Sequence, residues 1–161
     1  YGGEMKDVLT SVRVMTEEGE IMELPAEKLG LGYRTSIIPE KRYIVLGAVI
    51  SLTEGKKEEI KAQMDDLRQK RVSKQPLEYP SAGSTFKRPE GYFAGKLIQD
   101  SGLKGFTVGG AQVSEKHSGF VINKGNATAA DVMELIRQVT AKVKEDTGVT
   151  MEPEVKQIGE F

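Results

Sequence analysis

The sequence predicts an α+β fold, and three observations support this. Apolar residues alternate with polar ones early in the chain, as in Val8 to Met15, which is the two-residue period of a strand. Two later stretches instead repeat apolar residues every three to four positions, which is the period of an amphipathic helix. Two prolines and a loss of periodicity between residues 72 and 80 predict a boundary between two lobes. We place the lobes at residues 1–72 and 73–161.

In the first lobe, Val8 to Met15 and Glu20 to Leu24 are expected to form a hairpin across the turn at Glu17 to Gly19. The apolar run Tyr43 to Ile50 is long enough to lie centrally in a sheet. From Glu54 to Arg71 the period becomes helical. One stripe of that helix is apolar, and it consists of Ile60, Met64 and Leu67.

The second lobe is predicted to have the element order β-α-β-β-α-β. A strand-like Gly-rich segment precedes a short helix at Tyr92 to Gln99, which Gly102 closes. Strands are expected at Phe106 to Val113 and at Ser118 to Asn123. Thr128 caps the last helix, Gly148 ends it, and a closing strand is expected near Thr150 to Ile158. The buried face of that last helix should consist of Val132, Leu135, Ile136, Val139 and Val143.

Composition excludes several classes of protein. The chain has 161 residues and no cysteine, so a disulfide framework, a catalytic thiolate and a zinc–thiolate site are absent. His117 is the single histidine and cannot build a multi-histidine metal centre. No apolar run reaches the roughly 18 residues of a membrane span, and a net charge of −1 argues against a protein that holds nucleic acid by its overall field. We therefore expect no metal, membrane or nucleic-acid partner, and any redox chemistry needs a bound cofactor.

Four local segments could carry chemistry, although each has a plainer explanation. Ser81 to Pro89 combines small residues with Ser84, which allows close approach to a ligand but equally suits a turn with a capping serine. Arg34 follows an aromatic residue and could hold a carboxylate, or lie on the surface. Glu154 could point inward or face solvent. Lys116 to Ala127 could be a core strand followed by turn residues. A serine hydrolase is disfavoured, because nothing in the sequence places an imidazole near Ser84.

Taken together, these segments resemble the second part of the UDP-N-acetylenolpyruvoylglucosamine reductase family. These flavoenzymes, also called UDP-N-acetylmuramate dehydrogenases, make UDP-N-acetylmuramic acid for bacterial peptidoglycan. The resemblance rests on six motifs in family order: Tyr1 to Met5, Tyr33 to Ser36, Gln75-Pro76 leading to Ser81 to Pro89, Gly109 to Ala111, Ile122 to Ala127, and Glu152 to Val155.

The resemblance implies a fold and a reaction. Residues 1–72 would be the second lobe of a PCMH/VAO-type FAD-binding domain, incomplete here, and residues 73–161 an α+β domain that binds the UDP-sugar. In the family, NADPH reduces FAD, and hydride then passes to C3 of the enolpyruvyl group of UDP-N-acetylglucosamine enolpyruvate. Protonation at C2 completes the product. The family works in the bacterial cytoplasm.

The resemblance also implies roles for particular residues. Ser84 matches the proton donor, and Arg34 and Glu154 match the pair that stabilises the developing enol. The family's flavin contacts fall on Tyr1, Gly2, Gly3 and Arg34. Substrate contacts fall on Lys74 for the diphosphate, and further on Arg88, His117 and Asn123.

One departure limits this transfer. Many members have Asn where this chain has Arg88, and the Lys-Arg-Pro form resembles a subtype without a tyrosine-bearing loop. Neither Tyr33 nor Tyr92 should therefore be assigned that loop's role. Two other classes remain open from the residues alone: a non-catalytic module that binds a sugar nucleotide, and a plain structural or interaction domain.

The family's Gly-rich flavin-binding segments precede the position that matches Tyr1. We therefore expect the full-length parent to be the enzyme and the 161-residue chain to be inactive by itself, its partner being the missing N-terminal lobe. Loss of that covering surface predicts an exposed apolar patch, or self-association, in the first lobe.

Our first prediction concerns the flavin. The purified 161-residue chain should bind FAD weakly or not at all, because much of the phosphate and ribityl contact comes from the missing segments. Absorbance near the flavin band after gel filtration measures this, with a full-length member of the family as the positive control. A stoichiometric yellow chromophore that survives the column would contradict it.

Overall fold

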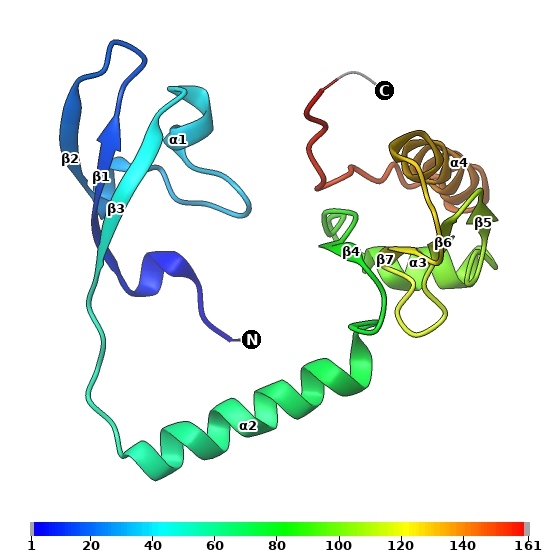
Figure 1. The fold of residues 1–161 in the computed structure, drawn as a ribbon, viewed down its shortest axis with the longest axis horizontal. Helices are drawn as coiled ribbons and strands as arrows, with labels where there is room; N and C mark the ends of the chain where they lie inside the picture. The colour runs from blue at the N-terminus through cyan, green and yellow to red at the C-terminus, as the bar shows by residue number, and fades with distance from the viewer. Residues whose placement is uncertain (1, 160–161) are drawn as a thin grey trace. The chain divides into compact units, whose positions relative to one another are not determined.

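The structure is a computed structural model that describes residues 2–159. The chain divides into two compact units, with the division between Met64 and Asp65 (Figure 1). Each unit combines short helices with its own antiparallel sheet, which confirms the predicted α+β class. We describe each unit by itself.

The first unit is built on a three-stranded sheet of order β2-β1-β3 (Figure 1). Its strands are β1 (Leu9–Met15), β2 (Ile21–Pro25) and β3 (Ile44–Ile50). The predicted hairpin is confirmed, since β1 and β2 pair antiparallel from Met15↔Ile21 onward. The prediction that the Tyr43 to Ile50 run lies centrally is wrong for the described chain. β1 has partners on both sides, whereas β3 lies at an edge.

One face of this sheet carries a small core, and the edge strand is open to solvent. Val12, Val14 and Leu29 are buried together, next to the short helices η2 (Ala26–Lys28) and α1 (Ile37–Glu40). On β3, by contrast, Ile44 and Val49 are each 54% exposed. The apolar patch expected for this lobe is therefore present on β3. A further short helix, η1 (Met5–Asp7), precedes β1.

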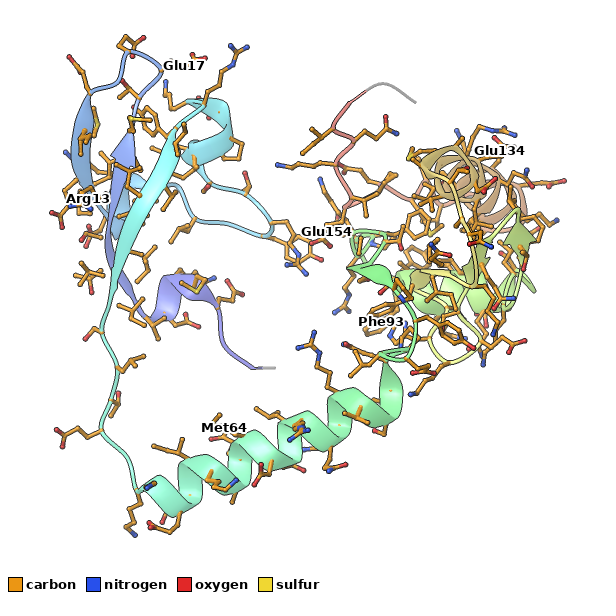
Figure 2. The ribbon with its side chains drawn as sticks, viewed as in Figure 1. Arg13, Glu17, Met64, Phe93, Glu134 and Glu154 are labelled. Atoms are coloured by element: carbon orange, nitrogen blue, oxygen red, sulfur yellow. The ribbon has the colours of Figure 1, made fainter. Side chains whose placement is uncertain are left out.

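The helix α2 (Lys57–Lys74) crosses the division between the units. It begins and ends three residues later than predicted, so the expected lobe boundary after residue 72 falls in its last turn. Its apolar stripe is not buried, since Met64 is 65% exposed (Figure 2) and Ile60 is 47% exposed. Lys and Glu side chains cover the rest of the helix.

The second unit has a four-stranded sheet of order β4-β7-β6-β5. Its strands are β4 (Ser81–Ser84), β5 (Thr107–Val108), β6 (Ala111–Val113) and β7 (Phe120–Asn123). The predicted single strand at Phe106 to Val113 is wrong, because Gly109-Gly110 makes it a hairpin. The predicted closing strand at Thr150 to Ile158 is also wrong. Only an isolated bridge, Phe86↔Pro153, pairs that segment with the rest of the unit.

Two helices cover this sheet and form the main core. α3 (Ala94–Asp100) buries Ala94, Leu97 and Ile98, as its spacing predicts. α4 (Ala129–Thr147) contacts β5, β6 and α3 (Figure 1). Each fully buried Leu, Ile or Val side chain contributes about 1.5–3 kcal/mol to folding. The predicted face of α4 is confirmed: Leu135, Ile136, Val139 and Val143 are buried, and Val132 packs partly buried beside them.

The ends of α4 follow the sequence closely. Thr128 Oγ1 accepts from the Asp131 N–H at 3.1 Å, and the Asp131 carboxylate accepts from the Thr128 N–H at 2.9 Å. This capping box satisfies two orphan donors of the first turn. The pKa of Asp131 is lowered, first by the backbone N–H of Thr128. Gly148 closes the helix with a φ of 74°, in the left-handed region that glycine adopts most easily.

The Gly109-Gly110 turn packs directly on the start of α4. A Cβ on Gly110 would overlap the carbonyl oxygen of Gly125 and the backbone of Ala127, and one on Gly109 would overlap the Asp131 carboxylate. The neighbours of Gly110 are backbone atoms, which cannot rotate away. This close approach explains the two consecutive glycines better than turn formation alone.

Gly110→Ala should therefore lower the free energy of unfolding by about 1–3 kcal/mol, because the added methyl group forces backbone apart. Urea denaturation measures the change. Gly125→Ala is the matched control, because a Cβ there meets nothing within 4 Å, and it should stay within about 0.5 kcal/mol of wild type. Equal stability of the two variants would contradict the packing argument.

A third prediction concerns pH. Arg137 donates to both carboxylate oxygens of Glu134, at 2.7 and 2.6 Å, and with Gln138 this lowers the pKa of Glu134 from 4.5 to about 2. Because the folded pKa lies below the unfolded one, this stabilisation is present above pH 4.5 and is lost as pH falls toward 2.

Carboxyl-carbon NMR should show Glu134 titrating with a midpoint near 2. Arg137→Met should raise that midpoint toward the ordinary glutamate value of about 4.3. Lys144→Met is the control: Lys144 is exposed on the same helix, and its replacement should leave the midpoint unchanged. A wild-type midpoint at the ordinary value would refute the contact.

Candidate active site

Ser84 lies at the end of β4 and lines a pocket of about 540 Å³ in the second unit. The pocket wall also includes Arg71, Gln75, Tyr79 and His117. Guanidinium, amide, phenol and imidazole groups are all hydrogen-bond donors, which suits a ligand rich in oxygen atoms. Two of the residues singled out from the sequence, Ser84 and His117, thus share one pocket.

A β-bulge places Ser84 at the pocket. β4 pairs with β7 at Ser81↔Ile122 and Ser84↔Phe120, with a shift of register between them. Gly83 has a φ of 90° inside this bulge, a conformation that costs glycine little and other residues more. The interpretation of this segment as a simple turn is wrong, because Ser81 to Ser84 form strand β4. Ser81 Oγ does accept a weak hydrogen bond from the Gly83 N–H at 3.4 Å.

Contacts with Gly119 and Phe120, which follow it closely in the chain, hold the His117 ring beside Ser84. Its Nδ1 accepts from the Gly119 N–H at 3.1 Å, and its ring meets Phe120 edge-on at a centroid distance of 4.9 Å. The acceptor role leaves the proton of the neutral ring on Nε2. A Cβ on Gly119 would lie 3.0 Å from His117 Cε1 and 3.7 Å from Ser84 Oγ. The absence of a side chain at Gly119 therefore lets the ring and the hydroxyl approach each other.

No sequence pattern indicates that His117 lies near Ser84, because strand register decides it. The proximity does not make a hydrolase triad. A triad needs a carboxylate that orients the imidazole through Nδ1, and here Nδ1 accepts from a backbone N–H instead.

Glu154 reaches the same region from the far end of the chain. Its backbone N–H donates to the carbonyl of Thr85 at 2.8 Å, and the Lys87 N–H donates to the carbonyl of Glu152 at 2.9 Å. Lys87 and Glu152 also form an ion pair through their side chains. This short antiparallel pairing brings Glu154 beside the residue that follows Ser84 (Figure 2). Glu154 is half-buried there.

Two lysines hold the segment that forms one wall of the pocket. Lys116 Nζ donates to the Val72 carbonyl at 2.9 Å, at the C-terminal end of α2. Lys124 Nζ donates to Tyr79 Oη at 2.8 Å, which is the main cause of a raised Lys124 pKa. Lys74, the residue matched to the substrate diphosphate, is exposed at the end of α2, next to the pocket residue Gln75.

Two other residues matched to the substrate do not line this pocket. The Arg88 guanidinium stacks over the Phe93 ring, with Cζ 3.9 Å from the centroid, and Nε donates to the Tyr92 carbonyl. Asn123 Oδ1 accepts from the Ala127 N–H at 3.1 Å, which is the turn-forming role that its residue type favours. Asn123 instead borders a smaller, apolar pocket of about 380 Å³ against α4.

Arg34 belongs to the first unit, at the tip of a tight hairpin. Gly32 and Thr35 exchange two backbone hydrogen bonds of 3.1 and 3.3 Å, which leaves Tyr33 and Arg34 as the two turn residues. Arg34 has a φ of 55° where glycine or asparagine is usual. Such backbone strain is found most often where a side chain must be presented in one direction.

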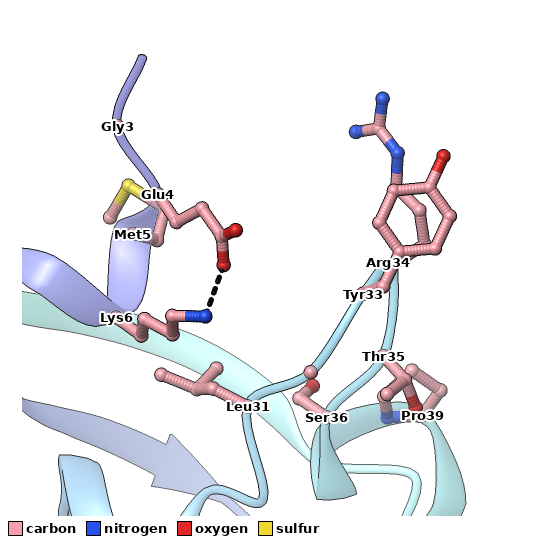
Figure 3. Close-up of a pocket in the computed structure, with 11 residues that line it drawn as sticks. Gly3, Glu4, Met5, Lys6, Leu31, Tyr33, Arg34, Thr35, Ser36 and Pro39 are labelled. Carbon is pink, nitrogen blue, oxygen red and sulfur yellow. Dashed lines mark ion pairs between the residues drawn. The ribbon is translucent and has the colours of Figure 1, made fainter. Parts of the chain in front are cut away.

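The hairpin borders a pocket of about 580 Å³ within the first unit (Figure 3). Gly3, Lys6, Arg34 and Ser36 line it, so Gly3 and Arg34 of the predicted flavin set share one site. Lys6 forms an ion pair with Glu4 at 2.7 Å, which raises the Lys6 pKa (Figure 3). Gly2 is not among the lining residues, and Tyr1 lies outside the described residues.

The donor set of this pocket fits part of a flavin nucleotide. The two cations and the hydroxyls of Thr35 and Ser36 suit phosphate or ring carbonyl oxygens, and Gly3 presents backbone without a side chain. Among residues 2–159, no three His, Asp or Glu side chains gather as metal ligands, and no helix has the length and apolar character to cross a membrane.

The chain is similar to known proteins over its whole length. The family model of the UDP-N-acetylenolpyruvoylglucosamine reductase C-terminal domain matches residues 75–158. The UDP-N-acetylenolpyruvoylglucosamine reductase of Agathobacter rectalis is 63% identical over all 161 residues, and that of Lachnoclostridium phytofermentans is 61% identical over 160. The chain spans about half the length of these curated relatives, 51% and 52% respectively.

A solved structure is also similar. The crystal structure of UDP-N-acetylenolpyruvylglucosamine reductase from Thermus caldophilus superposes with a TM-score of 0.81 at 39% identity. The superposition covers 96% of this chain and 54% of the Thermus caldophilus chain.

Proposed function

We propose that this chain, which belongs to the UDP-N-acetylenolpyruvoylglucosamine reductase family, contributes the half of the reductase that protonates the substrate. The overall reaction would reduce UDP-N-acetylglucosamine enolpyruvate to UDP-N-acetylmuramate with NADPH and FAD, in the bacterial cytoplasm, for peptidoglycan synthesis. The observation that carries the proposal is that Ser84 lines a pocket rich in donors, while a backbone pairing brings Glu154 to the residue that follows Ser84.

The first unit would contribute to flavin binding. Tyr1, Gly2, Gly3 and Arg34 are the residues assigned to FAD, which, when bound, supplies the hydride transfer. The pocket beside the Tyr33-Arg34 turn supports the assignment of Gly3 and Arg34. Lys6 is an additional cation there that the sequence-based assignment missed, because a lone lysine carries no recognisable motif.

Ser84 would donate a proton from Oγ to C2 of the enolpyruvyl group. A serine hydroxyl is a weak acid in water, so it can serve only a strongly basic carbon in a site from which most water is excluded. Gly83 and Gly119 leave space around the hydroxyl for the substrate to approach. The Nε2–H of His117 faces a different direction from its anchored Nδ1 and remains available for a substrate oxygen.

Arg34 and Glu154 would stabilise the enol that develops during reduction. An arginine binds a carboxylate through two parallel hydrogen bonds and offsets the negative charge of the transition state. A glutamate can hydrogen-bond an enol oxygen when protonated, or orient its neighbours when ionised. Each role requires a defined position, which the strained turn at Arg34 and the paired backbone at Glu154 both favour.

The substrate diphosphate would bind near the end of α2. Lys74 is the assigned contact, and Arg71 on the pocket wall adds a second cation. Arg88 and Asn123 are kept as substrate contacts on family grounds. In the structure they serve local packing at the Phe93 ring and the Ala127 turn.

The test of this function is Ser84→Ala in the longest natural form of the protein. Turnover should fall by roughly 10²- to 10⁴-fold, because the positioned proton donor is lost, while UDP-sugar binding persists. Ser73→Ala is the matched control, since the Ser73 hydroxyl donates to the local Lys70 carbonyl on the exposed helix. Unchanged turnover with retained sugar-nucleotide binding would instead support the non-catalytic binding module.

A further inference from the structure

We propose that Thr85 is a positioning residue for this reaction, whose buried hydroxyl sets the spacing between the Ser84 hydroxyl and the Glu154 carboxyl. This inference rests on the proposed function and extends it to a residue that neither the motifs nor the pocket assigns. Thr85 lies directly after Ser84 and is only 3% exposed. It does not line the Ser84 pocket.

Three hydrogen bonds anchor Thr85 to two different segments, the start of β7 and the C-terminal segment at Glu154. Its N–H donates to the Gly119 carbonyl at 2.8 Å, its carbonyl accepts from the Glu154 N–H at 2.8 Å, and its side-chain Oγ1 accepts from the Val121 N–H at 3.0 Å. Ser84 is covalently attached to this anchor, and Glu154 is hydrogen-bonded to it. Both proposed reacting groups therefore depend on the position of a single residue.

The side chain of Thr85 takes a role that backbone usually fills in a sheet. The register shift in β4 changes the pairing with β7 just before this point. The N–H of Val121 then bonds to the Thr85 hydroxyl. A buried N–H without an acceptor is costly, so the hydroxyl holds the end of the bulged strand against β7. Position 85 therefore requires a short side chain with an acceptor oxygen.

Loss of this anchor should act on catalysis more than on binding. Thr85 does not line the pocket in which the substrate would bind, and its hydroxyl bonds to the Val121 N–H instead, so it would support Ser84 and Glu154 without touching the substrate. Misplacing a reacting group by about 1 Å can reduce a rate on the order of 10²-fold. Such a shift changes the distance for proton transfer without removing any ligand contact.

The experiment compares Thr85→Val and Thr85→Ser in the longest natural form of the protein, below the unfolding temperature of each variant. Thr85→Val keeps the shape but removes the acceptor, and kcat should fall roughly 10- to 100-fold with little change in KM. Thr85→Ser keeps the acceptor and should restore most of kcat. Thr140→Val is the matched control, because the buried Thr140 hydroxyl has no hydrogen-bond partner among the described residues. It should leave kcat unchanged.

Amide hydrogen exchange supplies a second readout that does not need turnover. The Val121 and Glu154 amides should be protected in the wild type and in Thr85→Ser, and the Val121 amide should lose protection in Thr85→Val. Unprotected amides in the wild type would overturn the inference even if Thr85→Val did not fold.

The kinetic outcomes separate this inference from the function beneath it. A Thr85→Val enzyme with kcat within twofold of wild type, or a Thr85→Ser enzyme as impaired as Thr85→Val, overturns the role of the hydroxyl alone. Full turnover by Ser84→Ala overturns the proposed function, and this inference falls with it.

Discussion

The second unit depends on one short backbone pairing, between residues 85–87 and 152–154. Two backbone hydrogen bonds, which together make the Phe86↔Pro153 bridge, join segments almost 70 positions apart in the sequence. Because the pairing is so short, it needs support from elsewhere. Thr85 ties it to β7, and the Lys87–Glu152 ion pair closes its outer side. The position of Glu154 relative to Ser84 follows from this arrangement.

The pocket at Ser84 combines rigid and polar parts. Its floor is the β4–β7 pair, which the core beneath α3 and α4 supports. Its wall is the segment after α2, which lysine contacts to a helix-end carbonyl and a tyrosine hydroxyl hold in place. Small residues at positions 83 and 119 keep the centre open. The site therefore rests on paired strands, of which β4 is bulged at Gly83, with loops at its border.

Sequence periodicity predicted the helices of the second unit well and the strands less well. α4 combines a capping box, a continuous apolar face and a terminal glycine, so every local signal agrees with its burial. The strands are only two to four residues long, and at that length alternation carries little information. The run at Phe106 to Val113 looked like one strand because its central glycines permit either a strand or a turn. Only the approach of that turn to α4 shows which is adopted.

Residue types and motif order determined the family resemblance and the chemical identity of the candidate residues. The resemblance matches Ser84 to a proton donor, and the absence of cysteine excludes a thiol from that role without any coordinates. Tertiary structure alone decided which of these residues meet. Ser84 shares a pocket with His117 because β4 pairs with β7, and it neighbours Glu154 because the C-terminal segment returns to Thr85. Strand register and long-range hydrogen bonds depend on the whole folded chain, and for that reason no local pattern could have predicted the role of Thr85.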